Sequence, residues 1–185
     1  MLGIIVPTIE AATGLPWTQE PEYPPEKVEA LETLGLFCTP QTAASRVYEI
    51  EIDKRRGDLA VFAEPCPELA RLIEAGTADD ILTALIGSHV ETLTRRVGRA
   101  PDRFILGCTH YEIAGDLFRK ALPQGAALIH QPAAAADSLE RYLTAHPEYD
   151  LGSTGLRRFL TTGPGGPQNG LVEAFWGAPL AFEAV

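Results

Sequence analysis

The sequence predicts an α/β fold, because short apolar runs alternate with longer amphipathic stretches along most of the chain. Apolar residues make up 45% of the 185 residues and the mean hydropathy is close to zero, which is typical of a globular protein. The strongest helical pattern covers residues 78–97, where apolar side chains recur at the spacing of one helix face. That face comprises Ile81, Leu82, Leu85, Ile86, Val90, Leu93 and Val97, and we assign it to core packing.

Six apolar runs predict the strands of this fold. Each run has the length of a short strand, and most are followed by polar or turn-forming residues. The runs cover residues 3–6, 34–38, 59–62, 104–106, 127–129 and 159–161.

Helices are predicted between the strands. The helix over 78–97 has two aspartates near its start and two arginines near its end, which favours the helix dipole. Thr39 can cap a helix that runs to about Lys54, since Pro40 is tolerated in the first turn. Two more helices are predicted over 111–122 and from about 132 to 143.

Two segments are predicted to be irregular. Residues 14–26 contain four prolines and cannot form a continuous helix. Residues 161–169 are rich in glycine and proline, but they lack the Lys-Ser/Thr ending of a phosphate-binding loop. We therefore interpret both segments as structural loops.

Composition argues against several classes of function. A net charge of −10 and a pI near 4.8 argue against nucleic-acid binding, which favours basic surfaces. The first apolar run has no basic residues before it and is cut short by Pro7, so neither a signal peptide nor a membrane span is expected. Three irregularly spaced cysteines indicate a reducing cytoplasm rather than a disulfide framework. No CxxC or HExxH pattern occurs, so no metal site is expected.

The chemistry is concentrated in Cys108-Thr109-His110, directly after the predicted strand 104–106. Ligands of open α/β sheets collect at such strand ends. A thiolate at the N-terminus of a helix also has a lowered pKa and a raised reactivity. From the residues alone two interpretations remain open: a reactive site, or an inert core cysteine beside a surface histidine.

Residues 105–111 resemble the second catalytic-cysteine motif of the cofactor-independent glutamate racemases, which belong to the aspartate/glutamate racemase superfamily. The resemblance extends over nearly the whole chain. Further similar segments are the Val6-Pro7 crossover, residues 36–42, Cys66-Pro67 with residues 72–76, residues 159–162 and residues 175–180.

The resemblance implies a racemase-type three-layer sandwich, with one complete domain and the C-terminal part of a second. Residues 8–136 would form the complete second racemase domain, which carries the Cys-Thr-His motif. Residues 137–185, with 1–7, would form part of the first domain. We expect exposed apolar surface in residues 137–185, and hence a homo-oligomer or a complementing half-domain.

The resemblance also implies an activity: the two-base interconversion of L- and D-glutamate for peptidoglycan synthesis, without a cofactor. Cys108 would be the base that works on the L-enantiomer, and His110 would tune its protonation. Glu74 matches the family glutamate near the substrate amine and the opposite cysteine. Without the resemblance, Glu74 reads as a solvated helix carboxylate.

Three threonines match the family's substrate contacts. Thr109 would hold the α-carboxylate and amino group of the substrate, and Thr39 and Thr42 its side-chain carboxylate. A helix-capping role for Thr39 and Thr42 is compatible with substrate binding.

The sequence also departs from the family. Neither the opening Asp-Ser turn nor the Cys-Asn-Thr motif of the first catalytic cysteine is present, and we expect Cys38 and Cys66 to be packed, inert thiols. The family usually has proline in place of Glu112 and commonly has Asp-Ser in place of His130-Gln131. The alternatives are therefore a catalytically inactive amino-acid-binding protein, or a subunit that needs a partner chain for the first cysteine.

Overall fold

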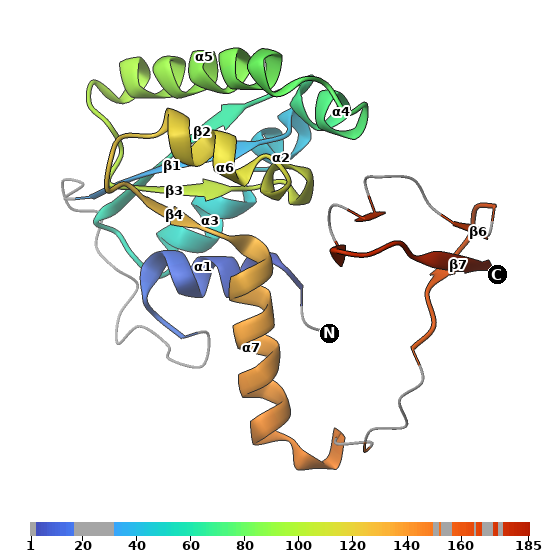
Figure 1. Ribbon diagram of the computed structural model, residues 1–185. Coiled ribbons are helices and arrows are strands. Elements are labelled where there is room, and N and C mark those ends of the chain that lie inside the picture. The colour runs from blue at the N-terminus through green and yellow to red at the C-terminus, as the bar shows by residue number, and fades with distance from the viewer. Residues whose placement is uncertain are drawn as a thin grey trace. The chain divides into compact units, whose positions relative to one another are not determined.

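The computed structural model describes residues 3–16, 32–149, 152, 157–164, 166–167, 172–173 and 176–185. The chain divides into two compact units, Met1–Arg141 and Tyr142–Val185 (Figure 1). Most of the predicted irregular segment 14–26 lies outside the described residues, as do parts of the predicted loop 161–169.

The first unit is built on a parallel sheet of four strands, which confirms the predicted α/β class. Its strands are β1 (Glu32–Cys38), β2 (Leu59–Pro65), β3 (Arg103–Leu106) and β4 (Ala127–Ile129), arranged in the order β2-β1-β3-β4. All three neighbouring pairs are parallel, so every strand ends at the same edge of the sheet. That edge is where an open α/β sheet places its ligands.

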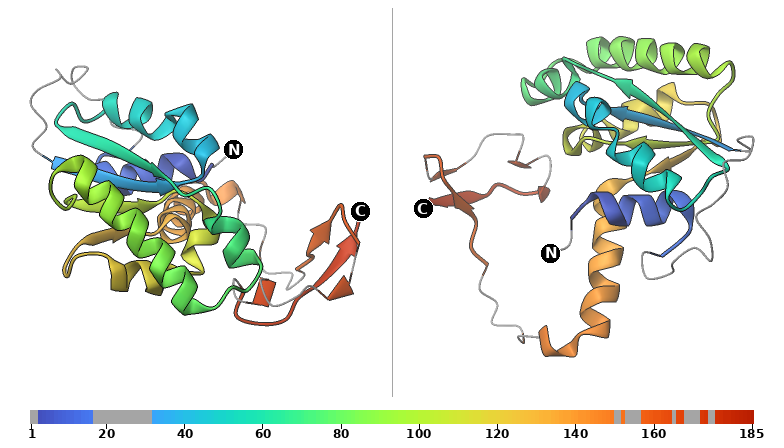
Figure 2. Two further views of the ribbon diagram at one scale, coloured as in Figure 1. Left: turned by 90° about the horizontal axis from the view of Figure 1, so that it is seen from above. Right: turned by 180° about the vertical axis from the view of Figure 1, so that it is seen from behind.

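Helices cover both faces of this sheet and give three layers (Figures 1 and 2). One face carries α4 (Leu69–Glu74), α5 (Asp79–Val97) and α6 (Gly115–Ala121). The other face carries α1 (Ile5–Thr13) and α3 (Val47–Asp53). Each face buries its own apolar cluster, because successive strand residues point to opposite sides of the sheet.

The alternation is clearest in β3 and β1. Phe104 and Leu106 pack under α5 and α6, whereas Ile105 packs on the α1 and α3 side. Gly35 of β1 leaves room for the Phe104 ring, since a Cβ there would lie 2.8 Å from a ring carbon. The two faces are thus filled by residues of the same short strands.

Helix α5 follows the predicted stripe with one exception. Leu82, Ile86, Val90 and Leu93 are buried as expected, but Ile81 is 55% exposed. Ile81 precedes the buried Leu82 by one residue, a rotation of about 100° around the helix, which turns Ile81 away from the buried face. The assignment of Ile81 to the core is therefore wrong.

The N-terminal strand predicted over 3–6 is also wrong. Residues from Ile5 onward form α1, where Pro7 lies in the first turn and needs no hydrogen-bond donor. Ile9 and Ala12 are completely buried under the sheet at helical spacing. A continuous apolar run without a strand partner is more stable when its own backbone satisfies its hydrogen bonds.

The single helix predicted from Thr39 to Lys54 is two helices in the structure. Helix α2 (Pro40–Ser45) is separated from α3 by Arg46, whose φ of 53° lies in the left-handed region. This break turns the chain so that Tyr48 and Ile52 enter the core. The predicted helix 111–122 likewise divides into a 3-10 turn, η1 (Thr109–Glu112), and α6. Strand β4 has its predicted bounds, and α7 spans Gln131–Ala145.

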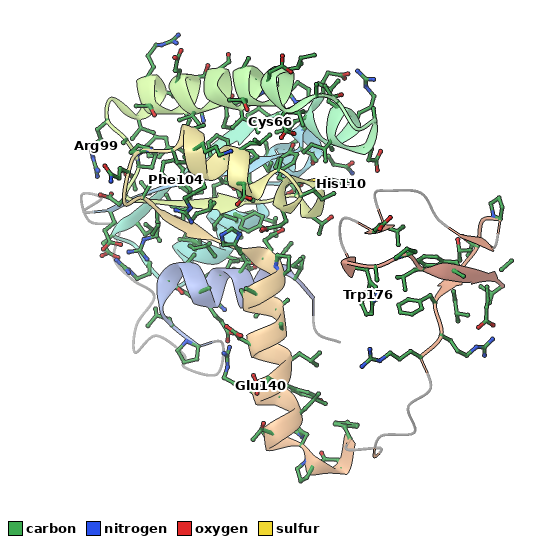
Figure 3. The ribbon with its side chains drawn as sticks, viewed as in Figure 1. Cys66, Arg99, Phe104, His110, Glu140 and Trp176 are labelled. Atoms are coloured by element: carbon green, nitrogen blue, oxygen red, sulfur yellow. The ribbon has the colours of Figure 1, made fainter. Side chains whose placement is uncertain are left out.

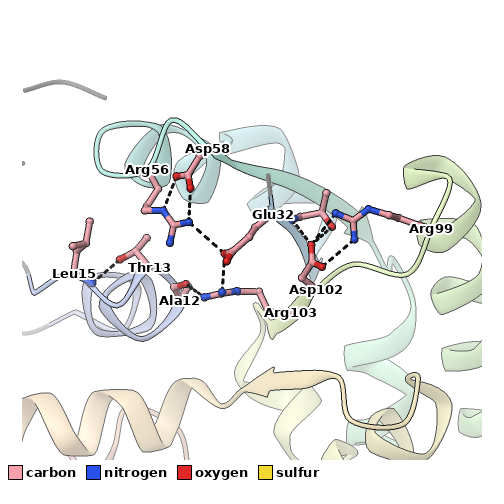
Figure 4. Close-up of polar contacts among 10 residues, drawn as sticks. Ala12, Thr13, Leu15, Glu32, Arg56, Asp58, Arg99, Asp102 and Arg103 are labelled. Carbon is pink, nitrogen blue, oxygen red and sulfur yellow. Dashed lines mark hydrogen bonds and ion pairs between the residues drawn. The ribbon is translucent and has the colours of Figure 1, made fainter. Parts of the chain in front are cut away.

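Charged side chains form contacts at the edge of the sheet where the strands begin, opposite to the edge formed by their carboxyl ends (Figure 4). Asp102 Oδ2 accepts hydrogen bonds from the backbone N–H and the hydroxyl of Thr33, at 2.7 and 2.9 Å, and pairs with Arg99 at 2.9 Å. Arg103 bridges Glu32 at 2.7 Å and the Ala12 carbonyl at 2.7 Å. These contacts join α1, β1 and β3 away from the candidate site.

The second unit contains η2 (Pro147–Tyr149) and a small sheet of β5 (Leu160–Thr161), β7 (Ala181–Ala184) and β6 (Gly166–Pro167), in that order. The predicted strand 159–161 is thus largely confirmed, and β6 lies inside the predicted loop 161–169. The exposed apolar side chains expected in residues 137–185 are present: Leu139, Tyr142, Leu143, Tyr149, Leu160, Trp176 and Val185. Among the described residues, no helix combines the length and apolar character needed to cross a membrane.

Candidate active site

The carboxyl ends of strands β1, β2 and β3 bring the predicted site residues to one edge of the sheet. Thr39 follows β1 directly, Glu74 ends the helix after β2, and Cys108 lies two residues after β3. His110 lies toward this edge, and Arg99 lies at the opposite one (Figure 3). The arrangement follows from the parallel topology, since every loop after a strand starts on the same side.

Three of these residues form a chain of contacts. The Cys108 Sγ lies 3.8 Å from His110 Nδ1, and His110 Nε2 lies 2.7 Å from Glu74 Oε1. A carboxylate that holds one ring nitrogen leaves the other nitrogen to face the thiol, and this fixes the orientation of the imidazole. The set has the general form of a nucleophile or base, its proton acceptor and an orienting carboxylate.

The environment of Cys108 affects its protonation in both directions. Burial raises the pKa of the Cys108 thiol, and the backbone N–H groups of His110 and Tyr111 oppose that rise. The negative charge of Glu74 adds a further, smaller increase of the pKa. Because the net change is upward, the thiol form of Cys108 is favoured.

Cys38 and Cys66 are packed thiols, as the sequence predicts. Their residues are 0% and 1% exposed, respectively. Burial raises the pKa of Cys38 to about 12 and also raises the pKa of Cys66. A thiol that stays protonated and excluded from solvent is a poor acid or base, so Cys108 is the accessible thiol of this edge.

Thr39 and Thr42 form a pair of their own at the end of β1. The Thr39 hydroxyl accepts the Thr42 backbone N–H at 3.2 Å, and their hydroxyl oxygens lie 3.0 Å apart. The predicted capping role is therefore confirmed. Thr109 lies in η1 and is exposed, with its neighbours Cys108 and His110 half-buried.

The turn that carries Cys108 is anchored by residues that sequence reasoning did not assign to the site. The Tyr111 hydroxyl donates to the Cys66 carbonyl at 3.0 Å in the buried core. Glu112 contacts His130 and Gln131, the residues after β4. The only sequence signal for these last contacts was the departure of Glu112 and His130-Gln131 from the family pattern.

Gly107 lets Cys108 approach β1 closely. Its backbone N–H donates to the Phe37 carbonyl at 2.7 Å. A Cβ at this position would lie 2.7 Å from Leu36 Cδ1, 3.1 Å from the Phe37 carbonyl oxygen and 3.2 Å from Cys38 Cβ. The crowding involves backbone as well as side chain, so the neighbours cannot simply rotate away.

We therefore expect Gly107→Ala to lower the free energy of unfolding by about 1–3 kcal/mol, the usual cost of overpacking. The matched control is Gly87→Ala in the middle of α5, where a Cβ meets nothing within 4 Å. Relief of glycine's helix penalty predicts a gain of about 0.5–1 kcal/mol there. Urea denaturation of both variants measures the difference, and equal stabilities would contradict the crowding at Gly107.

Among the described residues, no group of three or more histidine, cysteine, aspartate or glutamate side chains is arranged to hold a metal ion.

The sequence has curated relatives of high identity. The sequence matches no protein-family model. It is 68% identical over 183 residues to the glutamate racemase of Phenylobacterium zucineum, covering 99% of this chain and 65% of that protein. Over nearly its whole length the chain is similar to glutamate racemases. The glutamate racemase of Caulobacter sp. strain K31 is 67% identical over 184 residues, again with 65% of its length covered.

The fold agrees with the glutamate racemase family. A crystal structure of glutamate racemase from Francisella tularensis in complex with D-glutamate superposes with a TM-score of 0.77 at 22% identity. The superposition covers 98% of this chain and 62% of that one. The predicted racemase-type α/β fold is thus confirmed, and the chain spans about two thirds of the length of the racemases it matches.

Proposed function

We propose that this chain acts in the racemisation of glutamate, with Cys108 as the acid/base group for one face of the substrate. The observation that carries the proposal is the contact chain of Cys108, His110 and Glu74 at the carboxyl edge of the sheet. High identity to glutamate racemases supports the choice of glutamate as the substrate. The proposed pathway is cell-wall peptidoglycan synthesis in the cytoplasm.

The chemistry requires removal of a weakly acidic proton from one face of Cα and delivery of a different proton to the opposite face. In the proposed mechanism Cys108 transfers its thiol proton to His110, and the resulting thiolate removes the α-proton of L-glutamate. In the reverse direction the same thiol delivers a proton to that face. Glu74 orients the His110 ring through its contact with Nε2.

Binding of the substrate is proposed for the three threonines. Thr109, next to Cys108, would contact the α-carboxylate and amino group. Thr39 and Thr42 would contact the side-chain carboxylate with their hydroxyl groups and the neighbouring backbone N–H groups. No cofactor is required in this scheme, because the acid/base groups and hydrogen-bond donors belong to protein residues.

The opposite face of the substrate needs a second acid/base group. Cys38 and Cys66 are buried, so we propose that neither serves this purpose. In the proposed domain division, residues 8–136 supply the Cys108 half of the site. Residues 137–185, with 1–7, belong to the other domain. A second copy of the chain or a complementing half-domain would then provide the second group.

The test is to incubate the purified 185-residue protein with L-glutamate in D2O, and to follow the α-proton by NMR and the D-enantiomer by chiral chromatography. We expect the α-proton signal to decrease, since Cys108 can exchange its proton with solvent. D-glutamate formation would show that a second group is also in place. Binding of glutamate without any loss of the α-proton would overturn the catalytic proposal and leave an amino-acid-binding protein.

A further inference from the structure

Glu112 connects the Cys108 turn to helix α7. It is the last residue of η1, and its two carboxylate oxygens contact different groups beyond β4. Oε2 lies 2.7 Å from His130 Nδ1, and Oε1 accepts the backbone N–H of Gln131 at 3.1 Å. Only 12% of the Glu112 side chain is exposed, so these bonds are largely shielded from solvent. Hydrogen bonds to a shielded carboxylate are stronger than those between neutral groups.

The connection continues into the core below the sheet. Gln131 is 2% exposed, and its side-chain amide donates to the Tyr48 hydroxyl of α3. Tyr48 is also 2% exposed and packs in the same apolar cluster as Cys38 and Ile105. A movement of Glu112 relative to α7 would therefore have to disturb a buried, hydrogen-bonded pair.

The η1 turn depends on such external contacts. It has four residues, no side-chain cap at Cys108, and internal backbone bonds of 3.0–3.1 Å from Tyr111, Ile113 and Ala114. A 3-10 turn of this length has poor hydrogen-bond geometry and little stability of its own.

Two adjacent residues hold this turn from opposite sides of the sheet. Tyr111 packs in the cluster under α4, α5 and α6, and its hydroxyl donates to the Cys66 carbonyl. Glu112 reaches toward α7 and, through Gln131, to the cluster on the α1 and α3 face. On the same face of the sheet, His110 of the turn also contacts Glu74 of α4 at 2.7 Å. Glu112 supplies a contact that holds the turn from the other face.

We propose that Glu112 is a positioning residue, which fixes the Cys108 turn by binding His130 and the N-terminus of α7. Its catalytic consequence rests on the proposed function, whereas its effect on the turn does not. Glu112 does not contact Cys108, so its loss should change the precision of the site rather than its chemistry. Misplacement of a reacting group by even about 1 Å can reduce a rate by on the order of a hundredfold.

The test compares Glu112→Ala with Asp116→Ala in the 185-residue protein. Asp116 is exposed, carries the same charge and lines the same surface pocket of about 240 Å³ as Glu112 and His130. Water from this pocket can reach the Gln131 N–H in the Glu112→Ala variant, so we expect it to fold. Hydrogen exchange of the amides in residues 109–114 reports the order of the turn without any substrate. We expect exchange to become at least about tenfold faster in Glu112→Ala and to stay unchanged in Asp116→Ala.

A second readout is the rate of α-proton exchange of glutamate. We expect kcat to fall by about tenfold or more while KM changes little, because the substrate contacts remain. Glu112→Gln keeps an oxygen that can accept the Gln131 N–H, so it should restore most of the protection and the rate. If Glu112 only stabilised the fold, Glu112→Ala would lower the free energy of unfolding without a selective fall in kcat. Glu112→Gln would then not restore the rate.

Unchanged amide exchange in Glu112→Ala would overturn the proposal. If that variant does not fold, His130→Ala removes one of the two contacts at a partly exposed position, and unchanged protection of residues 109–114 in His130→Ala would overturn the proposal equally. If the unaltered protein shows no α-proton exchange, the proposed function fails, but the amide measurement still decides the role of Glu112.

Discussion

Replacing Cys108 by alanine is expected to abolish the exchange of the glutamate α-proton with solvent. The substitution removes the thiol that contacts His110, and the other two thiols, of Cys38 and Cys66, are buried. General acid–base groups contribute about 10²–10⁴-fold to a rate, so a loss of at least about a hundredfold is expected. The measurement is deuterium incorporation into L-glutamate, followed by NMR at equal protein concentrations.

The matched controls are Cys38→Ala and Cys66→Ala. Both remove a thiol from the same edge of the sheet, but from buried positions. We expect both variants to keep activity within about tenfold of the original protein, since packing changes at the edge affect the site only indirectly. If exchange survived in Cys108→Ala and disappeared in Cys38→Ala, Cys38 would be the reacting thiol. That result would refute the proposed role of Cys108.

Replacing Phe118 by alanine is expected to lower the free energy of unfolding by about 3–5 kcal/mol, the typical cost of removing a buried phenyl ring. Phe118 is completely buried on α6, with its ring centroid 5.1 Å from that of Phe37 and 5.9 Å from that of Tyr111. The ring thus supports both the central strand and the turn after Cys108. Urea denaturation, monitored by circular dichroism, measures the loss.

Ile81→Ala is the control for this prediction. Ile81 is an apolar helix residue like Phe118, but it is 55% exposed on α5. Its truncation is expected to cost about 0.5 kcal/mol or less, as for most surface substitutions. If Phe118→Ala were as mild as Ile81→Ala, the packing of α6 against β1 and η1 would be incorrect.

The fold was predictable where local sequence and tertiary contacts agree. The strand 127–129 and the helix over 78–97 have both a clear pattern and a matching burial, so their bounds are almost the predicted ones. The run 3–6 failed because an apolar segment without alternation fits a strand or a buried helix equally well. The break at Arg46 could not be predicted, since a left-handed arginine is set by the packing of α3 and not by its own preference.

The site was predictable to different depths. Cys108 and His110 are close in sequence and follow a strand, so their contact follows from local geometry. Glu74 lies on another helix, and the sequence around it indicates only a surface carboxylate. Its contact with His110 depends on the order of the strands in the sheet. The bonds of Glu112 to His130 and Gln131 depend on the same order, and no local pattern indicates them.

The most direct test of the central claim is whether glutamate binds against Cys108. The rate of Cys108 alkylation by iodoacetamide is measured by peptide mass spectrometry in the 185-residue protein, at increasing L-glutamate, with L-glutamine as the control. The proposed site predicts a saturable slowing of Cys108 alkylation by glutamate and a weaker effect of glutamine, which lacks the side-chain carboxylate. An alkylation rate that is independent of glutamate concentration would contradict a glutamate site at this edge of the sheet.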